Sequence, residues 1–487
     1  MKHELGEAMH RLACSQQDAT RLVLLADETG NLSMRSPFAR DRDRIVFSRG
    51  FRRLARKTQV YLAGATSEHL RTRLTHTLEV AQIAKAMAYA LDMSCDLTEA
   101  IAFGHDVGHP PFGHAGEQQL NRILLGNEPL TGRIAHALVA HAAGRDNGGF
   151  KHNLQSVRLL TLLEEYHPGY DGLNLTIQCL EGILKHTKVK WSEDADSICV
   201  YPDGGTLWST LINDKSWCRT IEGQIVSLAD DIAQVGHDLS DAVEANVLPL
   251  DELLALEGVR HALEAAQSAG KVLDFSKIAG PIEYRRNVTN AQVLSSVIDY
   301  FVRATIAELK TTIASLDAKD KQVCGPLAEK VAPAADFEAL KEFKDNLVIN
   351  SYHVNRMDNK GQYLIRRLVD AYLSDPRQLP DTVLKRYLTV KYRELEKKRE
   401  AGFVTWLRRA KKLYRIIEPL TDTEEQSVIR FIALRPDGPA FRRLSAALLN
   451  KVTVYVALDG DYVRSVVDHI AGMTDDFAEQ EVGRLYH

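Results

Sequence analysis

The stretch from residue 96 to residue 117, DLTEAIAFGHDVGHPPFGHAGE, constrains the fold of this chain more than any other part of the sequence. Its first half has the apolar spacing of a helix. The Pro110-Pro111 pair must end that helix, because proline lacks a backbone N–H and its ring collides with the preceding turn. A second helix is expected to begin between Phe112 and Ala115, so two helices should meet at a short corner. Five side chains able to bind metal or transfer protons lie on this corner: His105, Asp106, His109, His114 and Glu117.

Polar residues mark the expected starts of the neighbouring helices. Asp96 can cap the helix that leads into the corner, with Glu99 three residues later completing a capping box. Ser67 is expected to cap the preceding helix, which is apolar nearly all round and should therefore be buried. His76 lies on that helix, with Arg73 one turn earlier. A buried histidine is more often simply hydrogen-bonded than a metal ligand, so helical position alone does not assign its role.

A later helix, expected over residues 222–242, has polar residues on an otherwise apolar surface. Asp230, Gln234, His237 and Asp238 share one face at i, i+4, i+7 and i+8. Burying an unpaired carboxylate is costly, so Asp230 needs a partner. A metal ion would serve, and so would an arginine or a lysine.

Helical patterns run through the rest of the chain and strand patterns are nearly absent, so the expected fold class is all-α. The 487 residues are 45% hydrophobic and 26% charged, which suits a water-soluble protein with a large core. A net charge of −4 argues against a globally basic nucleic-acid binder. The six cysteines form no CxxC pair, which argues against a zinc knuckle or a disulfide framework. The N-terminus has no signal-peptide pattern and no apolar run is long enough to span a membrane, so we expect a cytoplasmic protein without membrane contact.

We expect four regions along the chain: a lead-in over residues 1–34, a helical core over 35–245, a helical insertion over 246–335 and a C-terminal helical lobe over 336–487. Two segments are basic. The arginines of residues 35–57 could clamp a polyanion or form a salt-bridged, solvated helix face. Residues 385–415 interleave lysine and arginine with aromatic side chains, which suits single-stranded nucleic acid or a triphosphate. A solvated helix face is the commoner explanation of such a segment.

Taken together, several blocks of the sequence resemble the deoxynucleoside triphosphate triphosphohydrolases, the dGTPase family of HD-domain phosphohydrolases. The blocks are RSPFARDRDRIVFSRGFRRLARKTQVY (35–61), RLTHTLEV (73–80), FGHDVGHPPFGHAGE (103–117), GFKHNLQSVRLL (149–160), GLNLT and LEGILKH (172–186), EGQIVSLADDIA (222–233) and DHIAGMTDDFA (468–478). The resemblance implies that residues 35–245 are an HD-domain catalytic core, and that the C-terminal region, residues 336–487, completes the substrate pocket and forms oligomer contacts.

The resemblance also implies a divalent metal, Mn²⁺, Mg²⁺ or Fe²⁺, because imidazole and carboxylate ligands with open water positions suit these ions better than structural zinc. Its ligands would be His76, His105, Asp106 and Asp230. Asp231 is an alternative to Asp230 that helix geometry does not exclude.

Further roles carried over from the family concern the chemistry and the substrate. The catalytic residues would be His114, Glu117 and His109. The i, i+3 spacing of His114 and Glu117 would let the carboxylate orient the imidazole. The substrate-binding residues would be Arg53, Arg73, His152 and Lys185 at the phosphates and Gln59, Val60, Gln234 and Asp238 at the sugar. Gln234 departs from the family, because many members have a tyrosine at this position.

The function that follows is hydrolysis of a dNTP, with dGTP as first candidate, to the deoxynucleoside and inorganic triphosphate. One alternative is another HD-type phosphohydrolase that acts on guanosine tetraphosphate or a cyclic dinucleotide. A second alternative is a non-catalytic oligomer that senses nucleotides or single strands. The expected partners are the dNTP, further copies of the chain in a tetramer or hexamer, and single-stranded DNA.

Overall fold

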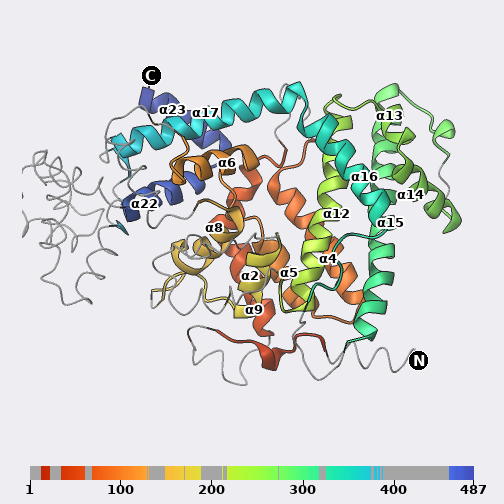
Figure 1. Cartoon of the computed structure of the whole chain (residues 1–487), viewed down its shortest axis with the longest axis horizontal. Helices are drawn as coiled ribbons and strands as arrows, with labels where there is room; N and C mark the ends of the chain where they lie inside the picture. Colours follow the sequence, from red (N-terminus) through yellow and green to blue (C-terminus); the bar gives the residue numbers. More distant parts are fainter. Residues whose placement is uncertain are drawn as a thin grey trace, which may run out of the picture. The chain divides into compact units, whose positions relative to one another are not determined.

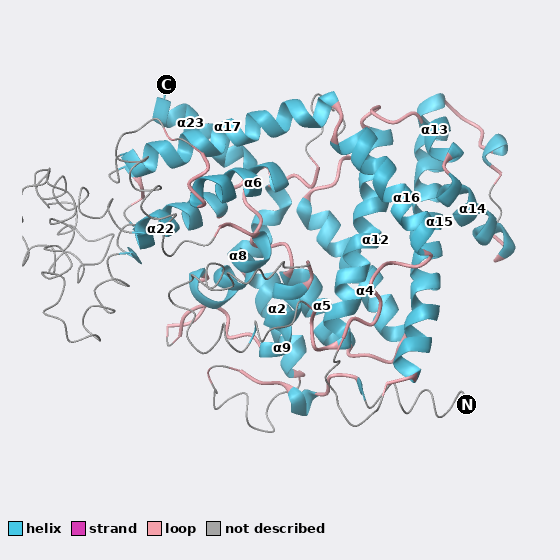
Figure 2. Cartoon of the chain, viewed as in Figure 1, coloured by secondary structure: helices cyan, strands magenta, loops and turns pink. Residues whose placement is uncertain are grey.

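The computed structural model of the chain confirms the all-α fold. Its described part contains helices and three isolated bridges but no strand (Figure 2). The structure describes residues 12–21, 23, 35–60, 69–128, 130, 149–168, 170–187, 211, 217–271, 274–316, 325–374, 378–380, 382–383, 386–387 and 460–486. Most of the basic segment 385–415 therefore lies outside the described residues.

The chain divides into two compact units. The first comprises Met1–His114, Lys151–Ser192 and Gly204–Lys360, and the second comprises Ala115–Phe150, Glu193–Asp203 and Gly361–His487. The α-helices of the first unit are α2 (Pro37–Phe47), α3 (Arg49–Arg53), α4 (Arg73–Ala90), α5 (Cys95–Gly104), α8 (His152–Arg158), α9 (Ile177–Lys185), α12 (Ile221–Glu244), α13 (Leu250–Ala255), α14 (Glu257–Ser268), α15 (Ile282–Ala314) and α16 (Ala334–Lys344). The second unit contains α22 (Gly460–Ala471) and α23 (Asp475–Tyr486), while α6 (Gly113–Leu124) and α17 (Tyr352–Ser374) begin in the first unit and end in the second.

Helix α12 is the centre of the first unit. It packs against α4, α5, α9, α15 and α16, and Figure 1 shows α4, α12 and α15 side by side. Thr220 caps its first turn by accepting a hydrogen bond from the backbone N–H of Gly223. Ile225, Leu228 and Ile232 recur at helical spacing and are buried. This apolar stripe fixes the rotation of α12 and thereby the direction of its polar face.

The helix that leads into the corner begins two residues earlier than expected. Ser94 is the N-cap of α5 and accepts from the N–H of Leu97, so the prediction that Asp96 caps this helix is wrong. The Asp96 carboxylate instead accepts a hydrogen bond from the Ser36 hydroxyl at 2.6 Å. A distant partner therefore occupies the side chain that the local pattern assigned to the cap.

The cap of α4 also differs from the prediction. Thr72 is the N-cap and accepts from the N–H of Thr75, whereas Ser67 was expected in this role and lies outside the described residues. The expected start of the second corner helix is confirmed, because α6 begins at Gly113.

The arginines of residues 35–57 mostly have structural partners. Arg42 bonds Glu99 at 3.2 Å, and Arg44 donates to the carbonyl oxygen of Asn174 at 2.9 Å. These bonds join α2 to the segments around it, which favours the salt-bridged explanation of this segment over a polyanion clamp.

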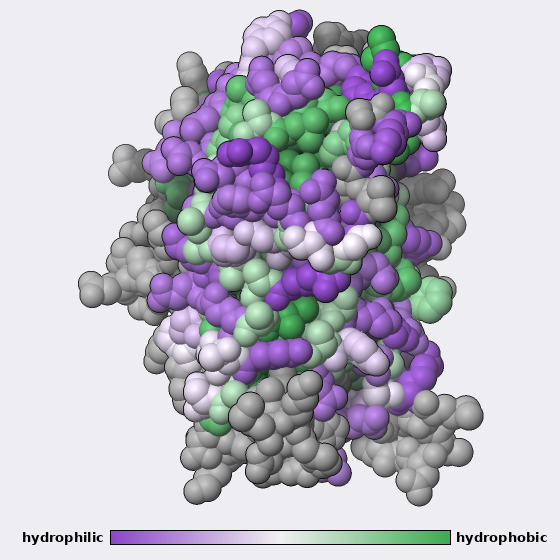
Figure 3. Space-filling view, turned by 90° about the vertical axis from the view of Figure 1, so that its right-hand side faces the viewer, coloured by the Kyte–Doolittle hydropathy of each residue, from purple (hydrophilic) through white to green (hydrophobic). Residues whose placement is uncertain are grey.

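The surface that carries α13, α14 and α15 is mostly hydrophilic, with smaller apolar areas between the polar side chains (Figure 3). Ile282 and Tyr284, in the first turn of α15, are among the exposed apolar residues. Within the described ranges, no helix is both long enough and apolar enough to cross a membrane.

Candidate active site

The corner between α5 and α6 is held against α8 by close backbone packing. A Cβ atom on Gly108 would lie 2.1 Å from the backbone nitrogen of Ser156, so only glycine fits there. The Ser156 hydroxyl accepts from the Gly108 N–H at 2.9 Å and donates to the His105 carbonyl at 2.8 Å. This packing brings His152, at the start of α8, close to the corner.

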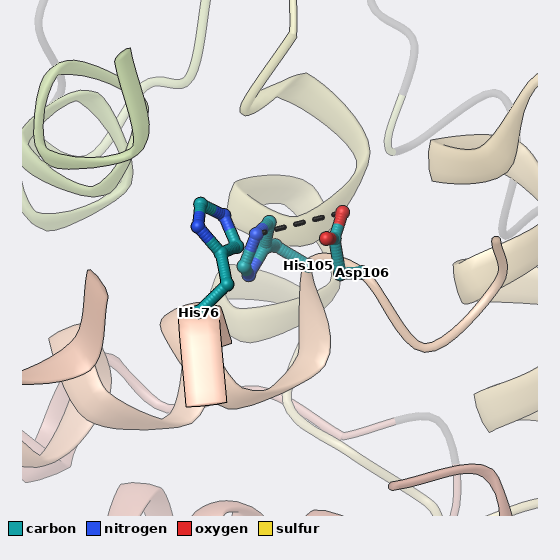
Figure 4. Close-up of side chains that lie close together, drawn as sticks. All are labelled: His76, His105 and Asp106. Atoms are coloured by element: carbon teal, nitrogen blue, oxygen red, sulfur yellow. Dashed lines mark ion pairs between the residues drawn. The ribbon is translucent and has the colours of Figure 1, made fainter. Parts of the chain in front are cut away.

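Four side chains from three helical segments converge beside the corner. His76 comes from α4, His105 and Asp106 follow the end of α5, and Asp230 comes from α12. His76 Nε2 lies 3.0 Å from Asp230 Oδ1, and His105 Nε2 lies 3.5 Å from Asp106 Oδ1 and 3.7 Å from Asp230 Oδ1. Figure 4 shows the His76 ring beside that of His105, with the Asp106 carboxylate facing His105. We refer to these four residues as the His–Asp cluster.

The hydrogen bonding of His105 tests whether this cluster fits a metal ion. Its Nδ1 lies 2.6 Å from the carbonyl oxygen of Ala102, and because a carbonyl can only accept, Nδ1 carries a proton. In a neutral ring Nε2 then has a lone pair, and this lone pair faces two carboxylate oxygens. Nε2 is buried and has no hydrogen-bond partner among the described residues. A cation between these atoms removes the repulsion, and two imidazoles with two carboxylates are a donor set that suits a divalent metal.

Arg73 adds an anion-binding group next to the cluster. It is buried and its Nη1 donates to Asp106 Oδ2 at 2.7 Å, while Nε and Nη2 have no partner in the described part of the chain. Gly113 has a φ of +56°, and a Cβ there would lie 2.9 Å from Arg73 Nη2. The glycine therefore leaves the space that this guanidinium occupies. Burial would raise the pKa of Asp106, but His105, His109 and Arg73 outweigh it and hold that pKa well below its usual range.

Three further imidazoles continue from the cluster. The ring of His109 stacks on that of His152 with centroids 3.8 Å apart, and His109 Nε2 lies 3.1 Å from Asp106 Oδ1. Burial and the Arg73 charge hold the pKa of His109 well below its usual value, which keeps the ring neutral. His152 Nε2 lies 3.2 Å from His186 Nε2. The exposed ring of His114 lies edge-on to His109, with centroids 5.2 Å apart.

These residues line a pocket of about 410 Å³ in the first unit. A second part of the lining is formed by α16 and the segment before it, and we refer to it as the α16 wall. The predicted site residues that line the pocket are Gln59, Arg73, His76, Asp106, His109, His114, His152, Asp230 and Gln234. Asp231 also lines it, but among the contacts described above the cluster uses Asp230. The residues of the α16 wall are Glu329, Lys330, Val331, Phe337, Glu338 and Lys341.

Four predicted substrate-binding residues lie outside the lining of this pocket. Arg53 is 3.9 Å from Glu164, Lys185 Nζ donates to Glu181 at 2.9 Å, and Asp238 lies 3.5 Å from Lys344. The fourth, Val60, is half-buried. Their contacts with a substrate stay predictions. Glu117 is buried one turn after His114 on α6, but it belongs to the second unit.

Three polar residues of the site were not assigned to it from the sequence. Ser156 fixes the corner, His186 faces His105 and His152, and His237 touches His76. His186 could have been found from its position, because it follows a helix end as His105 does. Its Nδ1 likewise bonds the carbonyl three residues back, that of Ile183, at 2.7 Å. Both rings use a carbonyl that a helix end leaves without an N–H partner.

Comparisons with known proteins agree with this geometry. Residues 73–234 match the HD domain family, and residues 330–400 match the phosphohydrolase-associated domain. The chain is similar to a deoxyguanosinetriphosphate triphosphohydrolase-like protein of Caulobacter sp. (strain K31), with 35% identity over 71% of this chain and 80% of the relative. A protein of the same description from Azoarcus sp. (strain BH72) is 36% identical over 74% of this chain and 85% of the relative.

Proposed function

Since the chain belongs to the HD-domain phosphohydrolases, among the deoxyguanosinetriphosphate triphosphohydrolase-like proteins, we propose that it hydrolyses a dNTP to the deoxynucleoside and inorganic triphosphate. The observation that carries this proposal is the juxtaposition of Arg73 and the His–Asp cluster. A buried guanidinium whose Nε and Nη2 have no partner in the described residues lies beside three ligands grouped closely enough to hold a metal, His76, His105 and Asp106. Asp230 lies 3.0 Å from His76, so a cation and an anion can bind side by side here. The pocket volume of about 410 Å³ also falls in the range of about 300–1,000 Å³ that is usual for small-molecule sites.

The bound metal would be held by His76, His105, Asp106 and Asp230, and it would supply charge stabilisation at the phosphate and acidify a bound water. Mn²⁺, Mg²⁺ and Fe²⁺ all suit these ligands. Arg73 would bind phosphate oxygens through Nε and Nη2, in the manner of an arginine fork. The neutral ring of His109, and the ring of His152 that stacks on it, would offer hydrogen bonds to the same oxygens.

The reaction breaks the bond between the α-phosphorus and the 5′-oxygen of the nucleoside. The oxygen of water bonds to the α-phosphorus and leaves with the triphosphate, while the 5′-oxygen takes a proton and leaves with the deoxynucleoside. His114 would move this proton, either from the attacking water or to the 5′-oxygen, because it is the exposed imidazole at the pocket. Gln59 would lie against the sugar, and its buried Oε1 has no partner among the described residues.

The test is to incubate the purified chain with Mn²⁺ and each dNTP in turn in ¹⁸O-labelled water. We expect triphosphate that carries the label, with unlabelled deoxynucleoside. The matched control is Asp106→Asn protein purified in the same way, which excludes a contaminating phosphatase. Release of pyrophosphate instead of triphosphate would contradict the proposal.

The same assay addresses the two alternatives. Hydrolysis of guanosine tetraphosphate or a cyclic dinucleotide, without turnover of any dNTP, would assign the chain to another HD-type activity. Tight nucleotide or single-strand binding without any turnover would assign it to a sensing role. The assembly into tetramers or hexamers, the binding of single-stranded DNA and the cytoplasmic location stay predictions from the sequence.

A further inference from the structure

His237 lies directly behind His76 and does not line the pocket. It is fully buried on α12, and its Nδ1 lies 3.0 Å from the Nδ1 of His76, with the two rings edge-to-face. The other nitrogen of His237, Nε2, lies 2.5 Å from Glu79 Oε2. His76 is therefore the first member of a row of three side chains that leads away from the metal ligands.

Helical spacing on two helices builds this row. Asp230 and His237 are seven residues apart on α12, which is about two turns, so they share one face. His76 and Glu79 are three residues apart on α4 and also share a face. As a result α12 contacts both nitrogens of His76, with Asp230 Oδ1 3.0 Å from Nε2 and His237 3.0 Å from Nδ1.

The far end of the row is anchored by Arg71. Its Nε donates to Glu79 Oε2 at 2.9 Å, and its backbone N–H donates to Asp241 Oδ2 at 3.2 Å. The Arg71 guanidinium also bonds Asp241. Glu79 therefore cannot rotate away from His237 without breaking its bond to Arg71.

The positions of the protons follow from the requirement for metal binding. An imidazole can give its Nε2 lone pair to a metal only if its Nδ1 carries the proton. The Nδ1–H of His76 then donates to Nδ1 of His237, which must be an acceptor. The proton of His237 then lies on Nε2, the nitrogen that faces the Glu79 carboxylate. Each ring thus has one proton, and the contact between the two Nδ1 atoms is a single hydrogen bond from His76 to His237.

We propose that His237 is a positioning residue that holds His76 in the tautomer and ring orientation needed to bind the metal through Nε2. The inference rests on the proposed function, because it requires a metal at the His–Asp cluster. His105 has the same need, and there the backbone carbonyl of Ala102 meets it. The two imidazole ligands are therefore oriented by different groups: a backbone carbonyl for His105 and a side chain for His76. Only the second can be removed by substitution.

Two isosteric substitutions of His237 distinguish a hydrogen-bonding role toward His76 from a role in core packing alone. The amide of Asn occupies the position of the histidine Nδ1, so His237→Asn keeps a hydrogen-bond partner for His76. The amide of Gln occupies the position of Nε2, so His237→Gln keeps the contact with Glu79 and loses the one with His76. The measurement is the Mn²⁺ dissociation constant of chelator-stripped protein by calorimetry or electron paramagnetic resonance, with thermal unfolding of the metal-free variants to show that both fold.

We expect His237→Asn to bind Mn²⁺ within about threefold of the parent, and His237→Gln to bind it about 10–100-fold more weakly, as for other groups that orient metal-bound histidines. Turnover of the Gln variant should recover as Mn²⁺ is raised. An unchanged constant in the Gln variant, or equal losses in both variants, would overturn the inference while leaving the proposed function intact. A parent protein that binds no Mn²⁺ would overturn the metal site itself, and this inference with it.

Discussion

The two walls of the pocket are built in opposite ways. In the His–Asp cluster, the side chains are largely buried and held by short bonds, such as those from His105 to Ala102 and from Arg73 to Asp106. On the α16 wall, Lys330 and Glu338 form a 3.3 Å pair in which both side chains are about half exposed to solvent. The first wall presents buried charges held by hydrogen bonds, whereas the charged pair of the second is open to water.

This difference has an energetic basis. A solvated ion pair contributes about 0–1 kcal/mol, because water competes for both charges. Removing one partner of a buried pair costs about 3–5 kcal/mol, because the other charge stays buried without compensation. Substitutions in the cluster should therefore change metal binding and turnover, and substitutions on the α16 wall should change substrate affinity by small factors.

The largest effect is expected from the carboxylate of Asp230, with Asp231 as its matched control. Asp230→Asn should remove most bound metal and nearly all activity, because the amide gives the ion a neutral ligand in place of an anion. Asp231→Asn lies on the same helix and in the same pocket, and we expect it to keep its metal. Elemental analysis of both variants, with activity measured alongside, decides the point. The reverse result would assign the ligand to Asp231.

A smaller effect on turnover is expected at His114. His114→Ala should keep the metal and lose about 10²–10⁴-fold in kcat, the usual contribution of a general acid or base. Because the ring is exposed, we expect the variant to fold as the parent does, and thermal unfolding checks this. Near-parental kcat with a full metal site would exclude His114 from the proton transfer.

The corner shows which features of the site are local in the sequence. The proline pair and the glycines predict where one helix ends and the next begins, so the start of α6 could be predicted to within two residues. The cap of α5 could not be placed, because the bond between Asp96 and Ser36 joins residues 60 positions apart. Local sequence patterns can predict where a helix ends. They cannot predict which distant residue will form a hydrogen bond with a candidate capping side chain.

The same limit explains what was missed in the site. His237 was placed on the correct face of its helix, but its role depends on Glu79 and His76, which come from another helix. The C-terminal region was expected to complete the pocket, but the α16 wall has residue types that are common on any solvated helix, so its local pattern does not show which side chains line the pocket. The His–Asp cluster was recognised because several sequence blocks resemble one family, and the distances between its members then came from the packing of α4, α5 and α12.

Lys341 tests the α16 wall. Lys341→Met keeps the length of the side chain and removes its charge, so it should raise KM for an anionic substrate several-fold and leave kcat within about twofold. The effect should shrink as salt is added, because solvated charges are screened. Lys277→Met, an exposed lysine outside the pocket lining, should change neither constant. A large loss of kcat in the Lys341 variant would mean that both walls take part in the chemistry.

The smallest effect is expected at Gln234, which lies one turn after Asp230 and lines the same pocket. Gln234 shares a feature with each wall. Its backbone belongs to α12, which also carries Asp230 of the His–Asp cluster, while its own side chain is a long amide without charge. Many members of the dGTPase family have a tyrosine at this position. A ring that packs against a ligand contributes about 0.5–1.5 kcal/mol of binding free energy beyond that from its buried area. Gln234→Tyr should therefore lower KM for the dNTP by several-fold at most. The value of kcat should change little, because a contact made equally with the substrate and the transition state does not alter the barrier between them.

Initial rates over a range of dNTP concentrations separate the two constants, and Gln234→Leu controls for apolar bulk without a ring. A large fall in kcat for the tyrosine variant would show that the pocket is shaped around glutamine, and the substrate would then have to be sought beyond the common dNTPs.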